Sequence, residues 1–134
     1  MFETIKVTST KRIEFIDITG KITNIIYKSG IKEGHCIILV PHTTAGVTIN
    51  ENADPDVAFD IMSKISKLIP QNESYAHIEG NSDAHIKSSL FGQTLNLIID
   101  NGNIVLGTWQ GIYFCEFDGP RSRKVWVKIL KENQ

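Results

Sequence analysis

The sequence predicts an α+β fold with a largely antiparallel β-sandwich core and two or three covering helices. Three observations support this class: short alternating or continuously apolar segments recur along the chain, turn signals such as Asn101-Gly102 separate several of them, and few stretches have helical spacing. No composition change, repeat or low-complexity tract divides the 134 residues. The sequence therefore predicts one domain over residues 1–134.

The first segments alternate in polarity and then acquire helical spacing. Phe2–Thr8 alternates between polar and apolar side chains, which predicts a strand with one apolar face, and Arg12–Ile16 continues as a short partner strand. A helix is expected over residues 19–29, with Thr19 as its N-cap and Gly30 at its end. The apolar residues at helical spacing in this helix are Ile22, Ile25 and Ile26.

The middle of the chain holds its longest apolar run, Cys36–Val40, which is typical of a central strand buried on both faces. An extended pattern resumes at Val47–Ile49. The pair Asp54-Pro55 then indicates a helix start, because a carboxylate caps the first turn and proline suits the first helical position. The apolar stripe of this helix is formed by Val57, Ile61, Ile65 and Leu68, and Pro70 ends it.

The last elements are a short helix and four strands. Asn81-Ser82-Asp83 can cap a helix that ends at Gly92. Asn101-Gly102 is a strong hairpin signal between the two strands around it. The four expected strands cover residues 94–100, 104–106, 111–117 and 124–130.

Composition argues against several classes of protein. The chain has 14 Lys and Arg against 15 Asp and Glu, and this balance disfavours broad electrostatic binding of nucleic acid. The longest apolar run is far shorter than the ~20 residues of a membrane helix, and no secretory signal opens the chain. Cys36 and Cys115 lie in apolar segments, so two buried free thiols are expected unless the fold brings them together. We therefore expect a cytoplasmic protein that binds neither nucleic acid nor membranes.

Three of the four histidines, His42, His77 and His85, lie in polar connections that contain glycine. Neutral imidazole is a common nitrogen ligand of zinc and similar metals, and Glu79 could join the histidines as a carboxylate ligand. The spacing matches no established metal signature, and a loop or cap imidazole that hydrogen-bonds the backbone is the alternative for each histidine. The metal hypothesis is a divalent ion, zinc or magnesium, held by His42, His77 and His85.

A second group of residues suits an anion. Arg121 and Arg123 flank a glycine-proline turn and can present forked donors to a phosphate or carboxylate, and the helix start at Asn81 offers free backbone N–H groups. The alternatives for the two arginines are a pair of surface charges beside the last strand, or ion pairing with Glu116 and Asp118. A further carboxylate, Glu51, follows the strand region of His42 and could face the same cleft.

Four motifs, in order along nearly the whole chain, resemble the YjbQ family. They are Pro41-His42-Thr43-Thr44-Ala45-Gly46, Asn50 to Pro55, Glu79-Gly80-Asn81-Ser82-Asp83-Ala84-His85, and Gly107-Thr108-Trp109-Gln110-Gly111 through Asp118-Gly119-Pro120-Arg121. The resemblance implies a small α+β protein with a β-sandwich core that forms homotrimers. It also implies a secondary thiamine-phosphate synthase activity, which joins a pyrimidine methyl diphosphate to a thiazole ethyl phosphate and releases pyrophosphate.

The resemblance, taken with the residues above, assigns expected roles. The metal ligands are His42, His77 and His85; the phosphate-binding residues are Arg121, Arg123, Asn81, Thr43 and Thr44; the catalytic set is His85, Asp83, Glu51 and Gln110. In that set Asp83 would orient a histidine or complete the metal shell, while Glu51 and Gln110 would contact the substrate ring. Metal and arginine together would neutralise the departing pyrophosphate.

The function that follows is a metal-assisted transferase acting on phosphorylated heterocycles. Two alternatives remain open: a homotrimeric, metal-dependent binding protein for a small phosphorylated metabolite without turnover, and a phosphate-ester hydrolase. Because the histidine motifs are spread along a short chain, we also expect the site to lie at a boundary between subunits.

Overall fold

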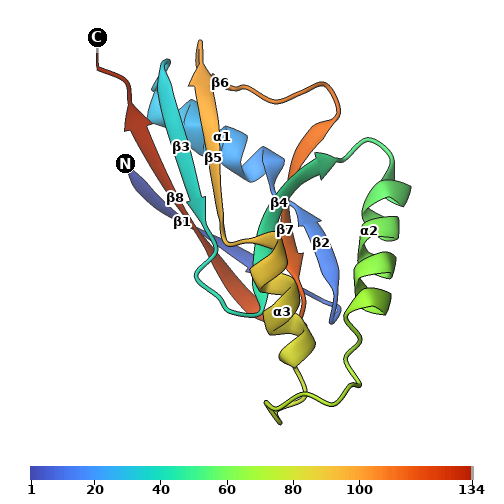
Figure 1. Ribbon diagram of the computed structural model, residues 1–134. Helices are drawn as coiled ribbons and strands as arrows, with labels where there is room; N and C mark the ends of the chain where they lie inside the picture. The colour runs from blue at the N-terminus through green and yellow to red at the C-terminus, as the bar shows by residue number, and fades with distance from the viewer. Residues whose placement is uncertain (134) are drawn as a thin grey trace.

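The computed structural model describes residues 1–133 and contains two antiparallel sheets and three helices (Figure 1). The five-stranded sheet has the order β1 (Phe2–Thr8), β8 (Ser122–Lys131), β3 (Gly34–Leu39), β5 (Thr94–Asp100) and β6 (Asn103–Ile104). The three-stranded sheet has the order β2 (Glu14–Asp17), β7 (Gln110–Glu116) and β4 (Ala45–Glu51). The predicted α+β class with an antiparallel, two-sheet core is therefore confirmed.

The helices are α1 (Thr19–Ser29), α2 (Pro55–Leu68) and α3 (Ser82–Phe91), close to their predicted bounds. Asp54 caps α2 as predicted, since its side chain accepts a hydrogen bond from the N–H of Asp56. The predicted cap of α1 is wrong: Ile18 occupies the N-cap position, and the carboxylate of Asp17 accepts the N–H of Thr19 at 2.9 Å. Gly30 ends α1 in the left-handed conformation, with φ of 71°.

The partner predicted for the second strand is also wrong. The segment was expected to pair with β1, but β2 pairs with β7 in the other sheet. The physical reason is its two apolar faces: Ile16 packs against the main core, whereas Phe15 packs against a second cluster on the opposite side. Such a strand suits the three-stranded sheet, which is covered on both faces.

The main core lies between the two sheets and includes the buried face of α1. A smaller cluster around Tyr113, Cys115 and Phe117 fills the space between the three-stranded sheet and the helices α2 and α3. Consequently β7 is the strand that is buried on both faces, from Gly111 to Glu116. The same prediction for Cys36–Val40 is wrong, because Ile37 and Leu39 on the outer side of β3 are only half-buried.

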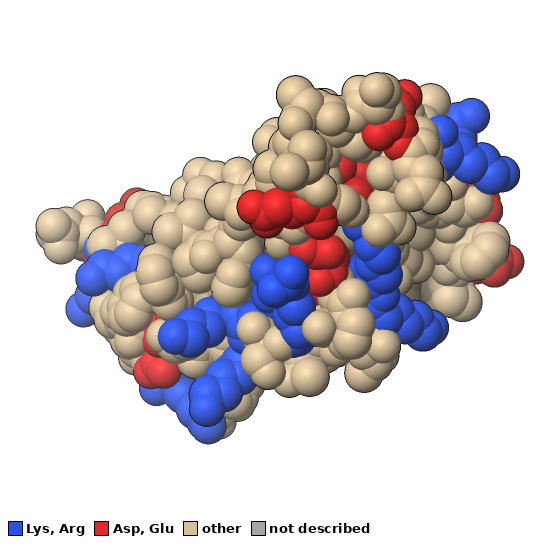
Figure 2. All heavy atoms as spheres, turned by 90° about the horizontal axis from the view of Figure 1, so that it is seen from below, with Lys and Arg blue, Asp and Glu red and all other residues tan. Residues whose placement is uncertain are grey.

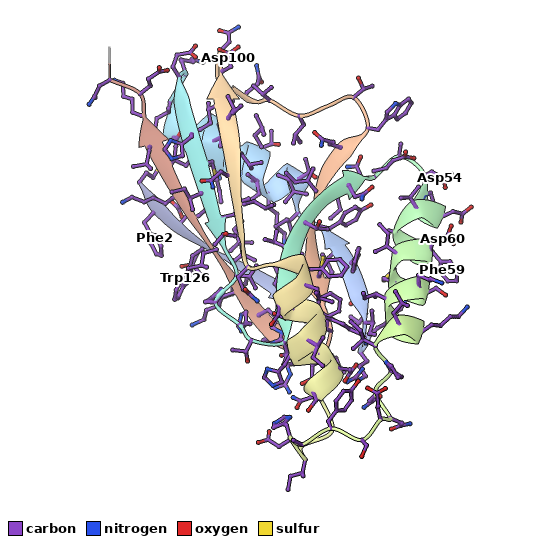
Figure 3. The ribbon with its side chains drawn as sticks, viewed as in Figure 1. Phe2, Asp54, Phe59, Asp60, Asp100 and Trp126 are labelled. Carbon is purple, nitrogen blue, oxygen red and sulfur yellow. The ribbon has the colours of Figure 1, made fainter. Side chains whose placement is uncertain are left out.

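The outer face of the five-stranded sheet carries no covering element among the described residues. Phe2 and Trp126 lie on this face with their ring centroids 6.2 Å apart (Figure 3). Ile98 and Leu130 share the face and are exposed. On α2, Phe59 points away from both sheets (Figure 3).

Both cysteines are buried and free, as predicted, because Cys36 lies in the five-stranded sheet and Cys115 in the three-stranded one. Burial raises the pKa of the Cys36 thiol to about 11. No helix among residues 1–133 is long and apolar enough to cross a membrane.

Candidate functional site

A cavity of about 790 Å³ opens at the lower end of the molecule in Figure 1, where three connecting regions meet. They are the β3–β4 connection, the β7–β8 turn and the first turns of α3. Figure 2 views the molecule from this end and shows basic side chains beside a group of acidic ones. The residues that line the cavity are Pro41, His42, Thr43, Thr44, Glu79, Asn81, His85, Ser89, Gln93, Arg121 and Arg123.

Helix α3 contributes to the cavity through one stripe of side chains. Asn81, His85 and Ser89 are spaced four residues apart, so they lie on one face and line the cavity. The stripe of Asp83 and Lys87 is buried on another face of the helix. One face of α3 therefore presents polar side chains to the cavity, and another face carries the polar side chains that fix the helix to the rest of the protein.

Arg121 is held by the carboxylate that precedes it in the turn. Its Nε donates to the backbone oxygen of Asp118 at 2.8 Å, and its Nη2 donates to Asp118 Oδ2 at 2.9 Å. The same oxygen accepts Nδ2 of Asn81 at 2.8 Å. No hydrogen bond among the described residues uses Nη1 of Arg121, whose side chain is 52% exposed, so this nitrogen is available to an anion.

Asn81 leaves one acceptor without a partner. Its Oδ1 is buried, and it is the one buried side-chain nitrogen or oxygen among residues 1–133 that makes no hydrogen bond. An unpartnered buried polar atom is costly, by about 1–3 kcal/mol. Because this oxygen can only accept a hydrogen bond, a phosphate oxygen would not satisfy it, and Asn81 contributes to the cavity through its place in the wall.

Arg123 forms the ion pair with Glu116 that the sequence left as its alternative. Its Nε donates to Glu116 Oε1 at 2.9 Å, a second guanidinium nitrogen donates to Oε2, and both side chains are buried. The hydroxyl of Ser9 also donates to Glu116 Oε1, at 2.7 Å. Burial alone would raise the pKa of Glu116, but the hydrogen bonds from Arg123 and Ser9 lower it below its ordinary value.

Thr44 joins this buried pair to the cavity wall. Arg123 Nη2 donates to Thr44 Oγ1 at 2.9 Å, and no hydrogen bond within residues 1–133 uses the hydroxyl hydrogen of Thr44. Thr43, next to it, is exposed and also lines the cavity. Of the predicted phosphate-binding residues, the structure thus brings Arg121, Arg123, Asn81, Thr43 and Thr44 together around one cavity.

His42 lines the cavity, but its geometry does not suit a metal ligand. Its Nε2 accepts the backbone N–H of Lys124 at 2.9 Å, which places the proton of the neutral ring on Nδ1. Burial lowers the pKa of His42 and is the largest cause, and the positive charge of Arg123 lowers it further. The neutral ring has no further lone pair for a metal, and it is instead a hydrogen-bond donor through Nδ1.

Asp83 does not orient a histidine or approach a metal position. Its two oxygens accept Nη1 and Nη2 of Arg12 at 3.0 and 2.9 Å, and Oδ2 also accepts Nζ of Lys87 at 2.7 Å. Burial alone would raise the pKa of Asp83, but these hydrogen bonds hold it below its ordinary value. The predicted catalytic role is therefore replaced by a structural one, because both oxygens are already bound by cations.

The predicted metal triad does not assemble within one chain. His77 and His85 lie close, with ring centroids 5.3 Å apart, and Glu79 Oε1 is 3.7 Å from His77 Nε2. Within residues 1–133, however, no three His, Cys, Asp or Glu side chains form a group that could hold a metal ion. The donor set present therefore does not fit a metal held by His42, His77 and His85.

Two predicted site residues lie at the far end of the three-stranded sheet. Glu51 pairs with Gln110 in the β4–β7 register, whereas the cavity lies beyond Ala45 at the other end of β4. At about 3.3 Å per residue, the two ends of β4 are roughly 20 Å apart. Glu51 and Gln110 are thus not brought to the cavity of their own chain.

The comparison with known proteins settles the family. The sequence model of the family described as "UPF0047 protein YjbQ-like" matches residues 3–132. The chain belongs to the YjbQ family. A UPF0047 protein of Methanocaldococcus jannaschii is 56% identical over 125 residues, which are 93% of this chain and 91% of that protein. YugU of Bacillus subtilis is 49% identical over 131 residues, covering 97% of this chain and 99% of that protein.

Solved structures of YjbQ-family proteins share the fold. A crystal structure from Clostridium acetobutylicum has a TM-score of 0.94 and 52% identity, and the match covers 96% of this chain and 99% of that one. A YbjQ-like protein from Sulfolobus solfataricus has the same TM-score at 37% identity, over 98% of this chain and 97% of that one. The names of these relatives state no reaction, so the activity must be inferred from the site.

Sequence reasoning missed the residues that support the YjbQ-family cavity from behind. Ser9 accepts the N–H of Arg121 at 2.8 Å, and the backbone oxygen of Arg12 accepts the N–H of Gly119 at 2.9 Å. A Cβ at Gly119 would lie 2.2 Å from the backbone oxygen of Lys11, so only glycine fits there. Ser9 and Arg12 stand in an ordinary connection without a motif, and no signal in the sequence links them to residues more than 100 positions away.

Proposed function

We propose that this cavity binds the phosphate or diphosphate group of a small metabolite. The observation that carries the proposal is the free Nη1 of Arg121 beside the Nδ1–H of neutral His42 and the hydroxyl of Thr44 in one polar cavity. Each of these groups donates hydrogen bonds, and each is held in place by a second hydrogen bond within the protein. Such prearranged donors suit a phosphate oxygen.

The charges around the cavity balance, but most of its carboxylates are already bound by cations. Its walls and support contain four cationic side chains, Arg12, Lys87, Arg121 and Arg123, and four carboxylates, Glu79, Asp83, Glu116 and Asp118. Asp83, Glu116 and Asp118 accept hydrogen bonds from these cations. The support for an anion therefore comes from the donors that remain free, and not from an excess of positive charge.

The proposed reaction is a transfer on phosphorylated heterocycles, with thiamine-phosphate synthesis as the specific case implied by the YjbQ resemblance. Departure of pyrophosphate requires neutralisation of negative charge, which Arg121 and the neighbouring donors would supply. His85 lines the same cavity, and its ring makes no hydrogen bond among the described residues. The ring nitrogen of the thiazole forms the new bond to the pyrimidine methyl carbon without losing a proton, and the carbon–oxygen bond to the diphosphate breaks, so we assign His85 as the group that donates a proton to the departing pyrophosphate.

A divalent cation, zinc or magnesium, belongs to this proposal as the companion of the phosphates. Diphosphates supply oxygen ligands of their own, and Mg²⁺ in particular keeps several such ligands and waters. Among the imidazoles of the cavity, His85 is the one whose ring nitrogens make no hydrogen bond within residues 1–133 and could contact this cation. The steps assigned to Arg121, His42 and His85 do not depend on a metal held by the protein.

We also propose that the chain assembles as a homotrimer. The uncovered sheet face around Phe2, Ile98 and Trp126 supports assembly, because contiguous exposed apolar surfaces mark contact sites. Glu51 and Gln110, which lie far from the cavity of their own chain, could reach a cavity only in a neighbouring subunit.

The test of the proposed function combines ligand binding with genetic rescue. Calorimetry with inorganic pyrophosphate, with and without Mg²⁺, is expected to show binding to the wild type that Arg121→Gln weakens about 10- to 100-fold. Lys67→Gln, which removes an exposed cation of α2 outside the cavity, is the matched control and should leave the affinity unchanged. In a thiamine-auxotrophic strain, the wild type should restore growth, and Arg121→Gln and His85→Ala should not.

The outcomes separate the candidate functions. Pyrophosphate binding without rescue would replace the transferase with a binding protein for a phosphorylated metabolite. Release of phosphate from p-nitrophenyl phosphate that depends on His85 would favour the hydrolase. Equal affinity of wild type and Arg121→Gln for pyrophosphate would contradict the proposal that this cavity binds phosphate groups.

A further inference from the structure

We propose that an apolar pocket beside the cavity, on the other side of His85, receives the ring of a ring-bearing phosphate ester. This inference rests on the proposed function, because the phosphate of the same ligand would occupy the cavity of Arg121. The pocket has a volume of about 410 Å³ and is lined by Tyr75, Ala76, His77, Ser82, His85 and Ile86.

Several polar groups of this pocket are already satisfied by the protein. Tyr75 donates its hydroxyl to the backbone oxygen of Pro70 at 2.6 Å. His77 Nδ1 and Ser82 Oγ are hydrogen-bonded to each other at 2.8 Å. Apart from the ring nitrogens of His85 and Nε2 of His77, the surface left for a ligand consists of aromatic rings and the aliphatic side chains of Ala76 and Ile86, and it suits an apolar or aromatic group.

His85 connects this pocket to the phosphate cavity, since it lines both. On α3, Asn81, His85 and Ser89 face the cavity, while Ser82 and Ile86, also four residues apart, face the pocket. The rings of His77 and His85 meet edge to face, with an interplanar angle of 88°. A ligand whose phosphate contacts Arg121 can thus extend across His85 and place its ring on this aromatic wall.

The other apolar groove on this side of the molecule lacks that connection. It lies between α2 and α3, is lined by Ile61, Ile65, Leu68 and Phe91 among others, and shares no residue with the phosphate cavity. Of these two apolar hollows, the pocket of Tyr75 and Ile86 is the one that shares a residue, His85, with the phosphate cavity.

Two probes of equal charge type test the inference: methyl phosphate, which has no ring, and benzyl phosphate, which has one. Calorimetric titration of the wild type should show about tenfold tighter binding of benzyl phosphate, from burial of its ring. Ile86→Ser should reduce this preference to less than about threefold and leave the affinity for methyl phosphate within about twofold of wild type. Leu90→Ser is the matched control, because Leu90 lies one turn further along α3, is 66% exposed and lies outside the pocket.

A second variant guards against misfolding of the first. Ala76 is exposed at the rim, so Ala76→Trp should fold and fill the pocket, abolishing the benzyl preference while methyl phosphate still binds. Thermal unfolding of each variant establishes that the protein is intact.

The results distinguish this inference from the proposed function. If neither ester binds, the phosphate site itself fails. If both esters bind wild type equally, or if Ile86→Ser and Ala76→Trp weaken both equally, the ring subsite is wrong and the phosphate cavity stands.

Discussion

The individual side chains of the site are mostly occupied by partners within the protein. Arg123 is bound to Glu116 and Thr44, Asp83 to Arg12 and Lys87, and His42 to the backbone of Lys124. Sequence reasoning predicted Arg121 as a phosphate donor because its motif is local, and the structure brings Arg121 to the cavity. It could not identify the role of Asp83, because the guanidinium that binds this carboxylate is 71 positions away.

The first prediction concerns the pH dependence of stability at His42. Its pKa is lowered in the folded protein relative to the ordinary value near 6.5, so the unfolded chain binds more protons at this residue. The stabilising effect of the neutral ring is complete above about pH 6.5 and is lost as the pH falls from there toward the folded pKa. His42→Gln, whose amide oxygen can still accept the N–H of Lys124, should flatten the change in unfolding free energy between about pH 7 and 5.

Urea unfolding at several pH values within that range measures the effect. A slope that is identical in wild type and His42→Gln would contradict the assignment of the neutral, Nε2-accepting ring.

At the scale of elements, local signals fixed the bounds of helices and strands but not their partners. Asp54-Pro55 and Gly30 mark helix ends whose chemistry lies within one turn, and both signals were reliable. Helix α3 has no apolar stripe, because it buries charged and small polar side chains on its inner faces; only its ends could be predicted. β2 pairs with the sheet that is covered on both faces, because its own side chains are apolar on both sides. Which sheet is covered in this way is a tertiary property, and the four residues of β2 do not reveal it.

The cap of α2 gives a prediction at this scale. Asp54→Ala removes the carboxylate that accepts the N–H of Asp56 at 2.9 Å and should lower the free energy of unfolding by about 1 kcal/mol. Asp60→Ala, an exposed carboxylate of the same helix that makes no hydrogen bond among the described residues, is the matched control and should change stability by less than about 0.5 kcal/mol. Equal losses in the two variants, measured by urea unfolding, would show that general charge and not capping is responsible.

At the scale of the whole molecule, one chain leaves two apolar surfaces uncovered. The first is the outer face of the five-stranded sheet around Phe2 and Trp126, and the second is the side of α2 on which Phe59 is exposed (Figure 3). The apolar run Cys36–Val40 predicted a strand buried on both faces, but within one chain the outer side chains of Ile37 and Leu39 are only half-buried, and Ile98 beside them is exposed. A strand pattern within one chain tells which side chains share a face, but not whether that face is covered by another chain.

The corresponding prediction is that the sheet face holds the trimer together. The wild type should scatter light at micromolar concentration with three times the 15.0 kDa mass of one chain. Ile98→Asp introduces a charge at a residue that is 63% exposed in the monomer, so it should leave the fold intact and reduce the mass toward that of a single chain. Ile78→Asp, at a residue 92% exposed and outside this face, is the control and should remain trimeric. A wild type that is monomeric under these conditions would contradict the proposed assembly.

The position of β8 in the five-stranded sheet has a consequence for how the protein is made. β8 is the last strand in the sequence, yet it lies between β1 and β3 and contributes Val125, Val127 and Ile129 to the main core. During synthesis, β1 and β3 therefore emerge from the ribosome without the strand that joins them. Unpaired strand edges and an incomplete core persist until residues 122–131 have emerged, and in that interval the growing chain exposes surfaces that are prone to aggregation.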